Sequence, residues 1–386
     1  MPILALALAA AVGPAGAAFY QPPVPLAPAM HGDVIWSRPW TAGAAPAGAA
    51  INTLVLYHTV GPDGRDVAVS GTVSIPKGDP PKGGWPVISW THGTSGNGPL
   101  CAPSRYEKPE GEQVLMSAFV DAGYAVVQTD YEGNGTPGIH PYFVMQQYAH
   151  DAGDMVRAAR QLYPAIGSRW LVMGHSEGGA ASIGVAAYAQ AWVPELQLLG
   201  SVAYAPGSHE YGLLQDMKQS QQPSLFLIFF ALMVQGQATA DPAVRPDELF
   251  YPNFTSKFPD LQRGCFWQID KDFGWMSLVP SEVFRRGADT TALERDLIAN
   301  DPGGLHVSVP LLVVQGTIDD EVGVVGTTQL VGALCARGAD VQYQIYDGKD
   351  HFTAMAASLA RSERWVADRF ASIPATSACG LPPPHY

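Results

Sequence analysis

The sequence predicts an α/β fold with a mostly parallel central sheet, helices on both faces and an inserted, mainly helical cap. Two observations carry this prediction. From about residue 85 onward, short apolar runs rich in β-branched residues alternate with amphipathic, alanine-rich segments, and such alternation indicates a parallel sheet covered on both sides. Between residues 206 and 304 the alternation stops while aromatic residues remain dense, which favours an insertion of a different character.

The expected elements follow in chain order. The first two predicted strands adjoin the turn sequence GPDG at 61–64 and should form an antiparallel hairpin. Residues 21–48, rich in Pro and Ala, are predicted to form an extended arm without periodicity. We predict strands at 51–60, 67–75, 87–90, 125–129, 170–173, 199–204, 310–315 and 341–346, and helices at 112–122, 148–163, 178–190, 325–337 and 353–370.

The predicted core comprises residues 19–205 and 305–386, and the predicted cap comprises residues 206–304. Inside the cap, the segment SLFLIFFALMVQG at 224–236 is almost wholly apolar. About a dozen residues are too few to span a bilayer, which needs roughly 20. We expect a buried helix that also covers an apolar pocket, with Phe229 and Phe230 lining that pocket.

Charge limits the partners of the protein. The 386 residues include 22 Lys plus Arg against 35 Asp plus Glu, giving a net charge of −13, and only 15% of the residues are charged. Binding to phosphate backbones needs the opposite sign, so no nucleic-acid partner is expected. Nothing in the sequence fixes the oligomeric state.

The N-terminus has features of a signal peptide. An apolar stretch at 3–12 is followed by small residues up to Ala18, which is typical of cleavage near Ala17 or Ala18. No Lys or Arg precedes the apolar stretch, so a disordered alanine-rich leader and a true start further upstream stay open as alternatives. We expect residues 1–18 to be a signal peptide and the protein to be secreted, extracellular or periplasmic.

The cysteines support export. No pair has the close spacing of a zinc site or a redox motif, and we expect no metal. In a cytosolic protein these residues would be buried thiols, whereas in an exported one they would form two disulfides with three connectivities open. The four residues are Cys101, Cys265, Cys335 and Cys379.

The sequence GHSEGG places Ser176 between Gly174 and Gly178, where a predicted strand passes into a predicted helix. A tight structural turn would explain the glycines. The alternative is a nucleophilic serine on the G-x-S-x-G elbow of an α/β-hydrolase. The pattern alone is common by chance, so the rest of the chain has to decide between the two.

A serine nucleophile needs a general base and an acid that orients the base, in the chain order Ser, Asp or Glu, His. His351 follows the strand predicted at 341–346, and Asp319 and Asp320 follow the strand at 310–315. The spacing G-x-x-D-x-x-V favours Asp319. Asp347 and Asp350 are too close in sequence to the histidine and are interpreted as loop or helix-cap residues. For His175, within the elbow, we expect a packing role pointing away from the substrate.

Acyl transfer also needs two N–H donors for an oxyanion. Glu177, directly after the serine, should supply one from its backbone. The loop THGTSGNG after the strand at 87–90 should supply the other, at Thr94, with Gly93 or Ser95 as alternatives. A Gly-rich phosphate loop is disfavoured because no lysine follows and no G-x-G-x-x-G is present.

Several segments together carry a family resemblance. GHSEGG, TDYEGNG at 129–135, CAPS at 101–104, RGCF at 263–266 and a cysteine sixteen residues before His351 resemble the secretory lipase family, of the yeast lipase A type, over about residues 50 to 380. The resemblance implies an α/β-hydrolase fold with an inserted helical cap and a triad of Ser176, Asp319 and His351. It also implies disulfides pairing Cys101 with Cys265 and Cys335 with Cys379. The loop HGTSG departs from the acidic loop of the yeast enzyme, so chain-length preference and the second oxyanion donor do not transfer.

The sequence therefore predicts a secreted serine carboxylic-ester hydrolase, a lipase or carboxylesterase, that acts through an acyl-enzyme. The expected substrates are esters with apolar acyl chains, such as lipids, and Phe229 and Phe230 would contact the acyl chain. We expect transient contact with a lipid interface and no metal or organic cofactor. An acyltransferase or peptidase using the same triad, or a non-catalytic binding module of the same fold, are the alternatives.

Overall fold

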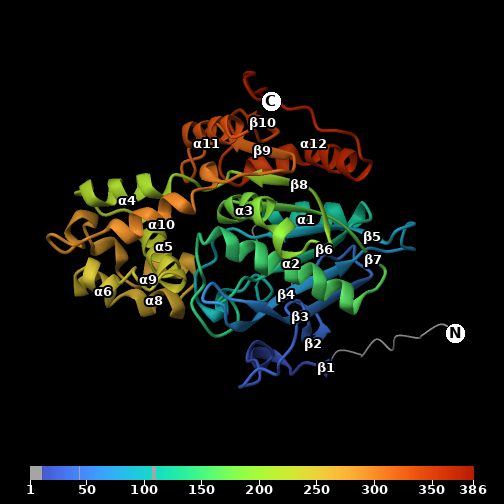
Figure 1. Ribbon diagram of the computed structural model, residues 1–386, viewed down its shortest axis with the longest axis horizontal. Helices are drawn as coiled ribbons and strands as arrows, with labels where there is room; N and C mark the ends of the chain where they lie inside the picture. Colours follow the sequence, from blue (N-terminus) through green and yellow to red (C-terminus); the bar gives the residue numbers. More distant parts are fainter. Residues whose placement is uncertain (1–10, 43, 107–109) are drawn as a thin grey trace.

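The computed structural model describes residues 11–42, 44–106 and 110–386. Within these residues, ten strands form a single sheet in the order β1-β2-β3-β4-β6-β5-β7-β8-β9-β10 (Figure 1). The strands are β1 Ala11–Val12, β2 Val34–Pro39, β3 Ile51–Val60, β4 Asp66–Ile75, β5 Trp85–Thr91, β6 Ala125–Thr129, β7 Ile166–His175, β8 Gln197–Tyr204, β9 Leu311–Gly316 and β10 Val341–Tyr346.

The sheet is mostly parallel, as predicted. β6, β5, β7, β8, β9 and β10 pair in parallel with their neighbours. β3 and β4 form the predicted antiparallel hairpin around the GPDG turn, and β4 also runs antiparallel to β6. Parallel neighbours bring the carboxyl ends of β5, β7, β9 and β10 to one edge of the sheet, which is where an α/β protein builds its site.

Helices cover both faces of the sheet. The flanking helices are α1 Glu110–Asp121, α2 Met145–Leu162, α3 Glu177–Trp192, α11 Val324–Ala336 and α12 Thr353–Phe370. Successive strand residues alternate between two buried clusters: Val172 packs with α2 and α3, whereas Leu171 and Met173 pack with α1 and α12. This alternation is the two-residue period of a strand that is buried on both faces.

Between β8 and β9 the chain leaves the sheet and forms a group of helices that lies beside it in Figure 1. Its buried helix α5 contains most of the apolar segment at 224–236. The helices are α4 Glu210–Gln219, α5 Phe226–Ala240, α6 Pro246–Leu249, α7 Pro252–Thr255, α8 Phe258–Arg263, α9 Phe266–Asp272 and α10 Thr291–Ala299. Short 3-10 turns complete the fold: η1 Gly16–Tyr20, η2 Pro99–Cys101, η3 Trp275–Ser277, η4 Pro280–Glu282 and η5 Pro302–Gly304.

The N-terminal arm at 21–48 is more regular than predicted. It contributes β2, which runs antiparallel to β3, and it buries Trp40 in a small cluster with Phe19 and Tyr20. The arm is extended, as predicted, but the sequence analysis did not identify the strand β2 within it, because backbone pairing in a sheet requires no apolar periodicity. Most of the apolar stretch at 3–12 lies outside the described residues.

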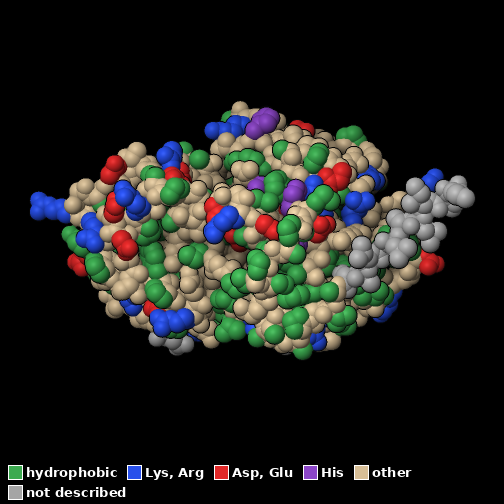
Figure 2. Space-filling view, turned by 60° about the horizontal axis from the view of Figure 1, so that its bottom comes forward, with side chains coloured by type: hydrophobic (Ala, Val, Ile, Leu, Met, Phe, Trp, Pro, Cys, Tyr) green, Lys and Arg blue, Asp and Glu red, His purple; other side chains and the backbone are tan. Residues whose placement is uncertain are grey.

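On the face drawn in Figure 2, acidic and basic side chains are interspersed among apolar ones, and neither charge forms a large patch. Within the described residues, no helix combines the length and the hydropathy needed to cross a membrane.

Candidate active site

Ser176 lies at the sharp turn between β7 and α3. Its backbone has φ 59° and ψ −119°, a strained conformation for a residue with a side chain. The two flanking glycines make the turn sterically feasible: a Cβ on Gly174 would lie 2.1 Å from Thr91 Oγ1, and one on Gly178 would lie 2.0 Å from Thr91 O. The glycines thus let the elbow pack directly against the end of β5.

His351 and Asp319 come together from the loops after β10 and β9. Nδ1 of His351 lies 2.8 Å from Oδ2 of Asp319, and both residues are buried. Burial by itself raises the pKa of the Asp319 carboxyl, but hydrogen bonds from His351, Val322 and Gln315 outweigh it and lower the pKa. The carboxylate therefore stays ionised and fixes the proton of the imidazole on Nδ1.

Asp320 and Asp350, the sequence neighbours of Asp319 and His351, do not contact the imidazole in the way that Asp319 does. Asp320 is exposed, so of the two candidate acids the structure brings Asp319 to the histidine. Asp350 accepts hydrogen bonds from the backbone N–H groups of Phe352 and Thr353 at the start of α12. It is one of the loop or helix-cap residues that the sequence analysis predicted, and it lies just before α12.

Ser176 and His351 line the same cavity, of about 590 Å³, together with Thr94. A second cavity, of about 350 Å³, also reaches Ser176 and extends under the helical insertion along Phe229. Both residues of the predicted Ser–His pair are described, and no hydrogen bond joins them in this structure. Such bonds are often long before substrate binds and tighten only in the complex.

Residues of the loop after β5 line the cavity that contains Ser176. The N–H of Gly93 already donates to Oε1 of Glu112, at 3.3 Å, whereas Ser95 does not line the cavity of 590 Å³. Thr94 lines it, and its Oγ1 is held 2.7 Å from the hydroxyl of Tyr142. Of the three candidates for the second donor, Gly93 and Thr94 line the cavity, and the N–H of Gly93 is engaged with Glu112.

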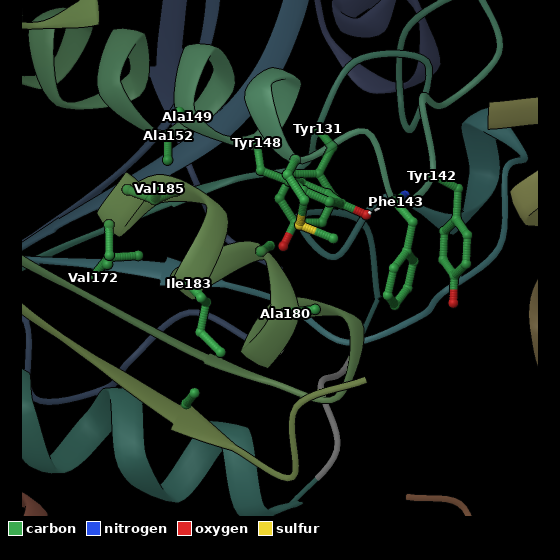
Figure 3. Close-up of a cluster of buried hydrophobic side chains, with 14 of the residues drawn as sticks. Tyr131, Tyr142, Phe143, Tyr148, Ala149, Ala152, Val172, Ala180, Ile183 and Val185 are labelled. Carbon is green, nitrogen blue, oxygen red and sulfur yellow. Dashed lines mark hydrogen bonds between the residues drawn. The ribbon is translucent and has the colours of Figure 1, made fainter. Parts of the chain in front are cut away.

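Behind the elbow lies a buried cluster of polar aromatic residues that sequence reasoning missed. Oε1 of Glu177 accepts a hydrogen bond from the Tyr148 hydroxyl at 2.8 Å and lies 2.8 Å from Nε2 of His140. Tyr131 stacks on His140 and contacts Tyr148 edge to face. Figure 3 shows Tyr131, Tyr142 and Tyr148 next to the start of α3. The cluster therefore fixes the side chain of Glu177, while the backbone of this residue forms the first position of α3, directly after Ser176.

His175 is buried next to His351. Its ring centre is 4.4 Å from that of His351, it lines the cavity of 590 Å³, and its Nε2 lies 2.8 Å from the backbone oxygen of His351. The side chain is buried and packs on His351 and Phe352, in agreement with the predicted packing role, and it points toward the loop after β10. Burial lowers the pKa of His175, which favours a neutral ring that donates to that oxygen.

The two phenylalanines of α5 that were predicted to line the pocket have different surroundings. Phe229 lines both cavities, but Phe230 is fully buried and packs against Phe250 and Phe254 inside the helical insertion. The expectation that Phe230 lines the pocket was wrong. Adjacent residues on a helix point about 100° apart, so only one of the two can face the cavity.

Disulfides join Cys101 to Cys265 and Cys335 to Cys379. The first ties the loop after β5 to the start of α9 in the insertion, and the second ties α11 to the C-terminal tail.

Comparison with known proteins gives consistent results. A model of the secretory lipase family matches residues 109–378. A probable inactive lipase of Mycobacterium tuberculosis is 26% identical over 398 residues, which cover 93% of this chain and 82% of the relative. Lipase 5 of Candida albicans is 22% identical over 395 residues, which cover 95% of this chain and 83% of the relative.

Solved structures share the fold. Candida antarctica lipase A in its closed state superimposes with a TM-score of 0.74 at 18% identity, covering 92% of this chain and 86% of that chain. The rice cell wall degrading esterase LipA from Xanthomonas oryzae gives a TM-score of 0.69 at 19% identity, and the match covers 89% of this chain and 98% of that chain. The α/β-hydrolase fold prediction is confirmed.

The family and the structural neighbours together support a hydrolase of ester bonds. The secretory family and the two disulfides indicate a secreted protein. Because the family match spans residues 109–378, well over half of the 386 residues, the chain belongs to the secretory lipase family.

Proposed function

We propose that the protein is a serine carboxylic-ester hydrolase acting through an acyl-enzyme. His351 takes the proton of Ser176 as the serine oxygen attacks the ester carbonyl, and Asp319 stabilises the imidazolium that forms. Nε2 of His351 then delivers the proton to the leaving alcohol, and water removes the acyl group by the same route. None of these steps uses a metal or an organic cofactor.

The observation that carries the proposal is one cavity holding three features of acyl transfer. Ser176 has a strained elbow conformation, His351 lines the same space, and Asp319 is bonded to the far nitrogen of that histidine. A structural turn explains the glycines but not a buried histidine–carboxylate pair opposite the serine. The same pair argues against a non-catalytic role for this chain, although one relative is named as an inactive lipase.

We further propose that the backbone N–H groups of Glu177 and Thr94 bind the oxyanion. The side chains of both residues are anchored, Glu177 by Tyr148 and Thr94 by Tyr142. Anchored donors need no reorganisation when charge develops on the carbonyl oxygen, which is the source of their catalytic effect.

The expected substrates are esters with an apolar acyl chain. Phe229 and Met233 of α5 line the smaller cavity, and each buried methylene contributes about 0.8 kcal/mol in such surroundings. At the cavity rims, Phe226, Trp267 and Phe352 remain 39%, 46% and 43% exposed. Such an apolar rim supports transient contact with a lipid interface.

Export would begin with removal of residues 1–18. Cleavage after Ala18 removes β1, whose residues Ala11 and Val12 are exposed, and retains Phe19, which is fully buried against the core. N-terminal sequencing of the protein from the culture medium tests this proposal. A mature chain that still begins at the first methionine would contradict it.

The test of the activity is hydrolysis of p-nitrophenyl butyrate by the wild-type protein and by Ser176→Ala. We expect the variant to lose several orders of magnitude in kcat while its thermal unfolding stays close to that of the wild type. Asp319→Asn should be severely impaired and Asp320→Asn nearly normal. Activity of Ser176→Ala above a few per cent of the wild type would refute the mechanism.

A further inference from the structure

A carboxylate that takes no part in the proposed triad faces the reacting nitrogen. Glu321 lies two residues after Asp319, and its backbone N–H donates to Oδ1 of Asp319 at 3.0 Å. Oε2 of Glu321 lies 3.7 Å from Nε2 of His351. Asp319 holds the other ring nitrogen, so Glu321 approaches the atom that exchanges a proton with Ser176 and with the leaving alcohol.

Glu321 also lies where the two cavities meet. Of the described residues, Ser176, Phe229 and Glu321 line both cavities. The side chain of Glu321 is 40% exposed, so its charge is accessible to a bound ligand. None of the described lining residues of either cavity is a lysine or an arginine.

The other carboxyl groups of these cavities are engaged or neutral. Glu177 is bonded to Tyr148 and His140, and Glu112 accepts from the indole N–H of Trp90 at 3.1 Å. Burial, with the nearby charge of Asp301, raises the pKa of the Glu210 carboxyl well above its usual range. Of the described carboxyl groups that line the two cavities, Glu321 is therefore the one that is exposed to a bound ligand: its side chain is 40% exposed, whereas Glu112, Glu177 and Glu210 are buried.

On the basis of the proposed function, we propose that Glu321 makes the site selective for esters whose alcohol part carries a positive charge, such as esters of amino alcohols. The leaving oxygen must approach Nε2 of His351 to be protonated, which places the first atoms of the alcohol beside Glu321. Phe266 and Trp267 line the same larger cavity as Glu321. Aromatic faces attract organic cations. The carboxylate of Glu321 and the rings of Phe266 and Trp267 would therefore both favour a cationic alcohol group.

The experiment compares two butyrate esters of the same shape. One is butyrylcholine, and the other is the neutral ester in which a quaternary carbon replaces its nitrogen. The wild-type protein should prefer the cationic ester by roughly three- to tenfold in kcat/KM. Glu321→Gln should bring this ratio close to one, Glu321→Asp should retain part of it, and Asp320→Asn, an exposed neighbour, should leave it unchanged. Raising the salt from about 0.01 M to about 1 M should lower the wild-type ratio.

A wild-type ratio of one or less, or a ratio that survives in Glu321→Gln, would overturn this inference. Thermal unfolding of each variant shows whether it is folded. Hydrolysis of p-nitrophenyl butyrate can depend on Ser176 while the kcat/KM ratio of the cationic to the neutral ester is the same in the wild type and in Glu321→Gln. In that case the charge selectivity fails and the proposed function stands. If Ser176→Ala retains hydrolysis of p-nitrophenyl butyrate, the proposed function itself fails.

Discussion

Asp151 is a buried carboxyl whose removal should stabilise the protein at neutral and alkaline pH. It lies on α2, accepts the backbone N–H of Glu132 at 3.0 Å and the side-chain amide of Gln147 at 2.8 Å, and is fully buried. Burial raises its pKa from 3.8 to about 7, because these hydrogen bonds only partly offset the loss of hydration. Above pH 7 the folded protein therefore contains a costly buried charge.

The sign and size of the effect follow from the two pKa values. The folded state binds the Asp151 proton more tightly than the unfolded chain, so the free energy of unfolding falls as the pH rises from about 4 to about 7. A difference of about three pKa units corresponds to roughly 4 kcal/mol. A neutral amide avoids this cost but forms a weaker hydrogen bond with Glu132. We expect Asp151→Asn to gain about 2–4 kcal/mol at about pH 8 and almost nothing at about pH 4.

The surroundings can accept the amide. Oε1 of Gln147 is buried and has no hydrogen-bond partner among the described residues, so a rotation of its amide would let it accept the new N–H. Urea unfolding at the two pH values, with the disulfides intact, measures the effect. The matched control Asp320→Asn changes an exposed carboxyl and should stay within about 0.5 kcal/mol. A gain of the same size at both pH values, or a loss at pH 8, would refute the reasoning.

Four further variants test the site and its supports. Phe229→Ala should lower kcat/KM for long-chain esters more than for acetate, by up to about fourfold for each methylene of the acyl chain that the shorter side chain leaves unburied. Phe230→Ala should leave that ratio unchanged but lower the free energy of unfolding by about 3–5 kcal/mol; a chain-length effect in Phe230→Ala would contradict the assignment. Gly178→Ala would place its Cβ 2.0 Å from a backbone oxygen of β5, so we expect at least a tenfold loss of kcat in a folded protein, and normal turnover would disprove the close packing. Replacing both Cys335 and Cys379 by Ser should cost roughly 2–4 kcal/mol in urea unfolding, and an unchanged midpoint would show that the bond does not stabilise the tail.

The sequence predicted the sheet well because most of its strands are buried on both faces. β3, β6 and β10 match their predicted bounds to the residue, since continuous β-branched and apolar runs bounded by turns leave little ambiguity. β2 was missed because its partly buried residues show no apolar periodicity, and pairing with β3 needs only the backbone. The predicted family and fold are confirmed by the comparisons.

The candidate site was predictable where chemistry fixes chain order and was not where it depends on side-chain direction. The order of Ser176, Asp319 and His351 followed from the loops after the strands β7, β9 and β10. The positions of the Glu321 and His140 side chains did not, because the direction of a side chain within a loop depends on tertiary packing. One signal was present for Glu321, which belongs to the acidic run DDE that follows β9.

The most direct test of the central claim is covalent capture of the nucleophile. The protein is treated with an organophosphonate ester, digested, and mapped by mass spectrometry. We predict a single label on Ser176 in the wild type, loss of labelling in His351→Ala, slower labelling in Asp319→Asn, and wild-type labelling in Asp320→Asn. A label on another serine, or labelling of Ser176 at the wild-type rate without His351, would contradict the proposed triad.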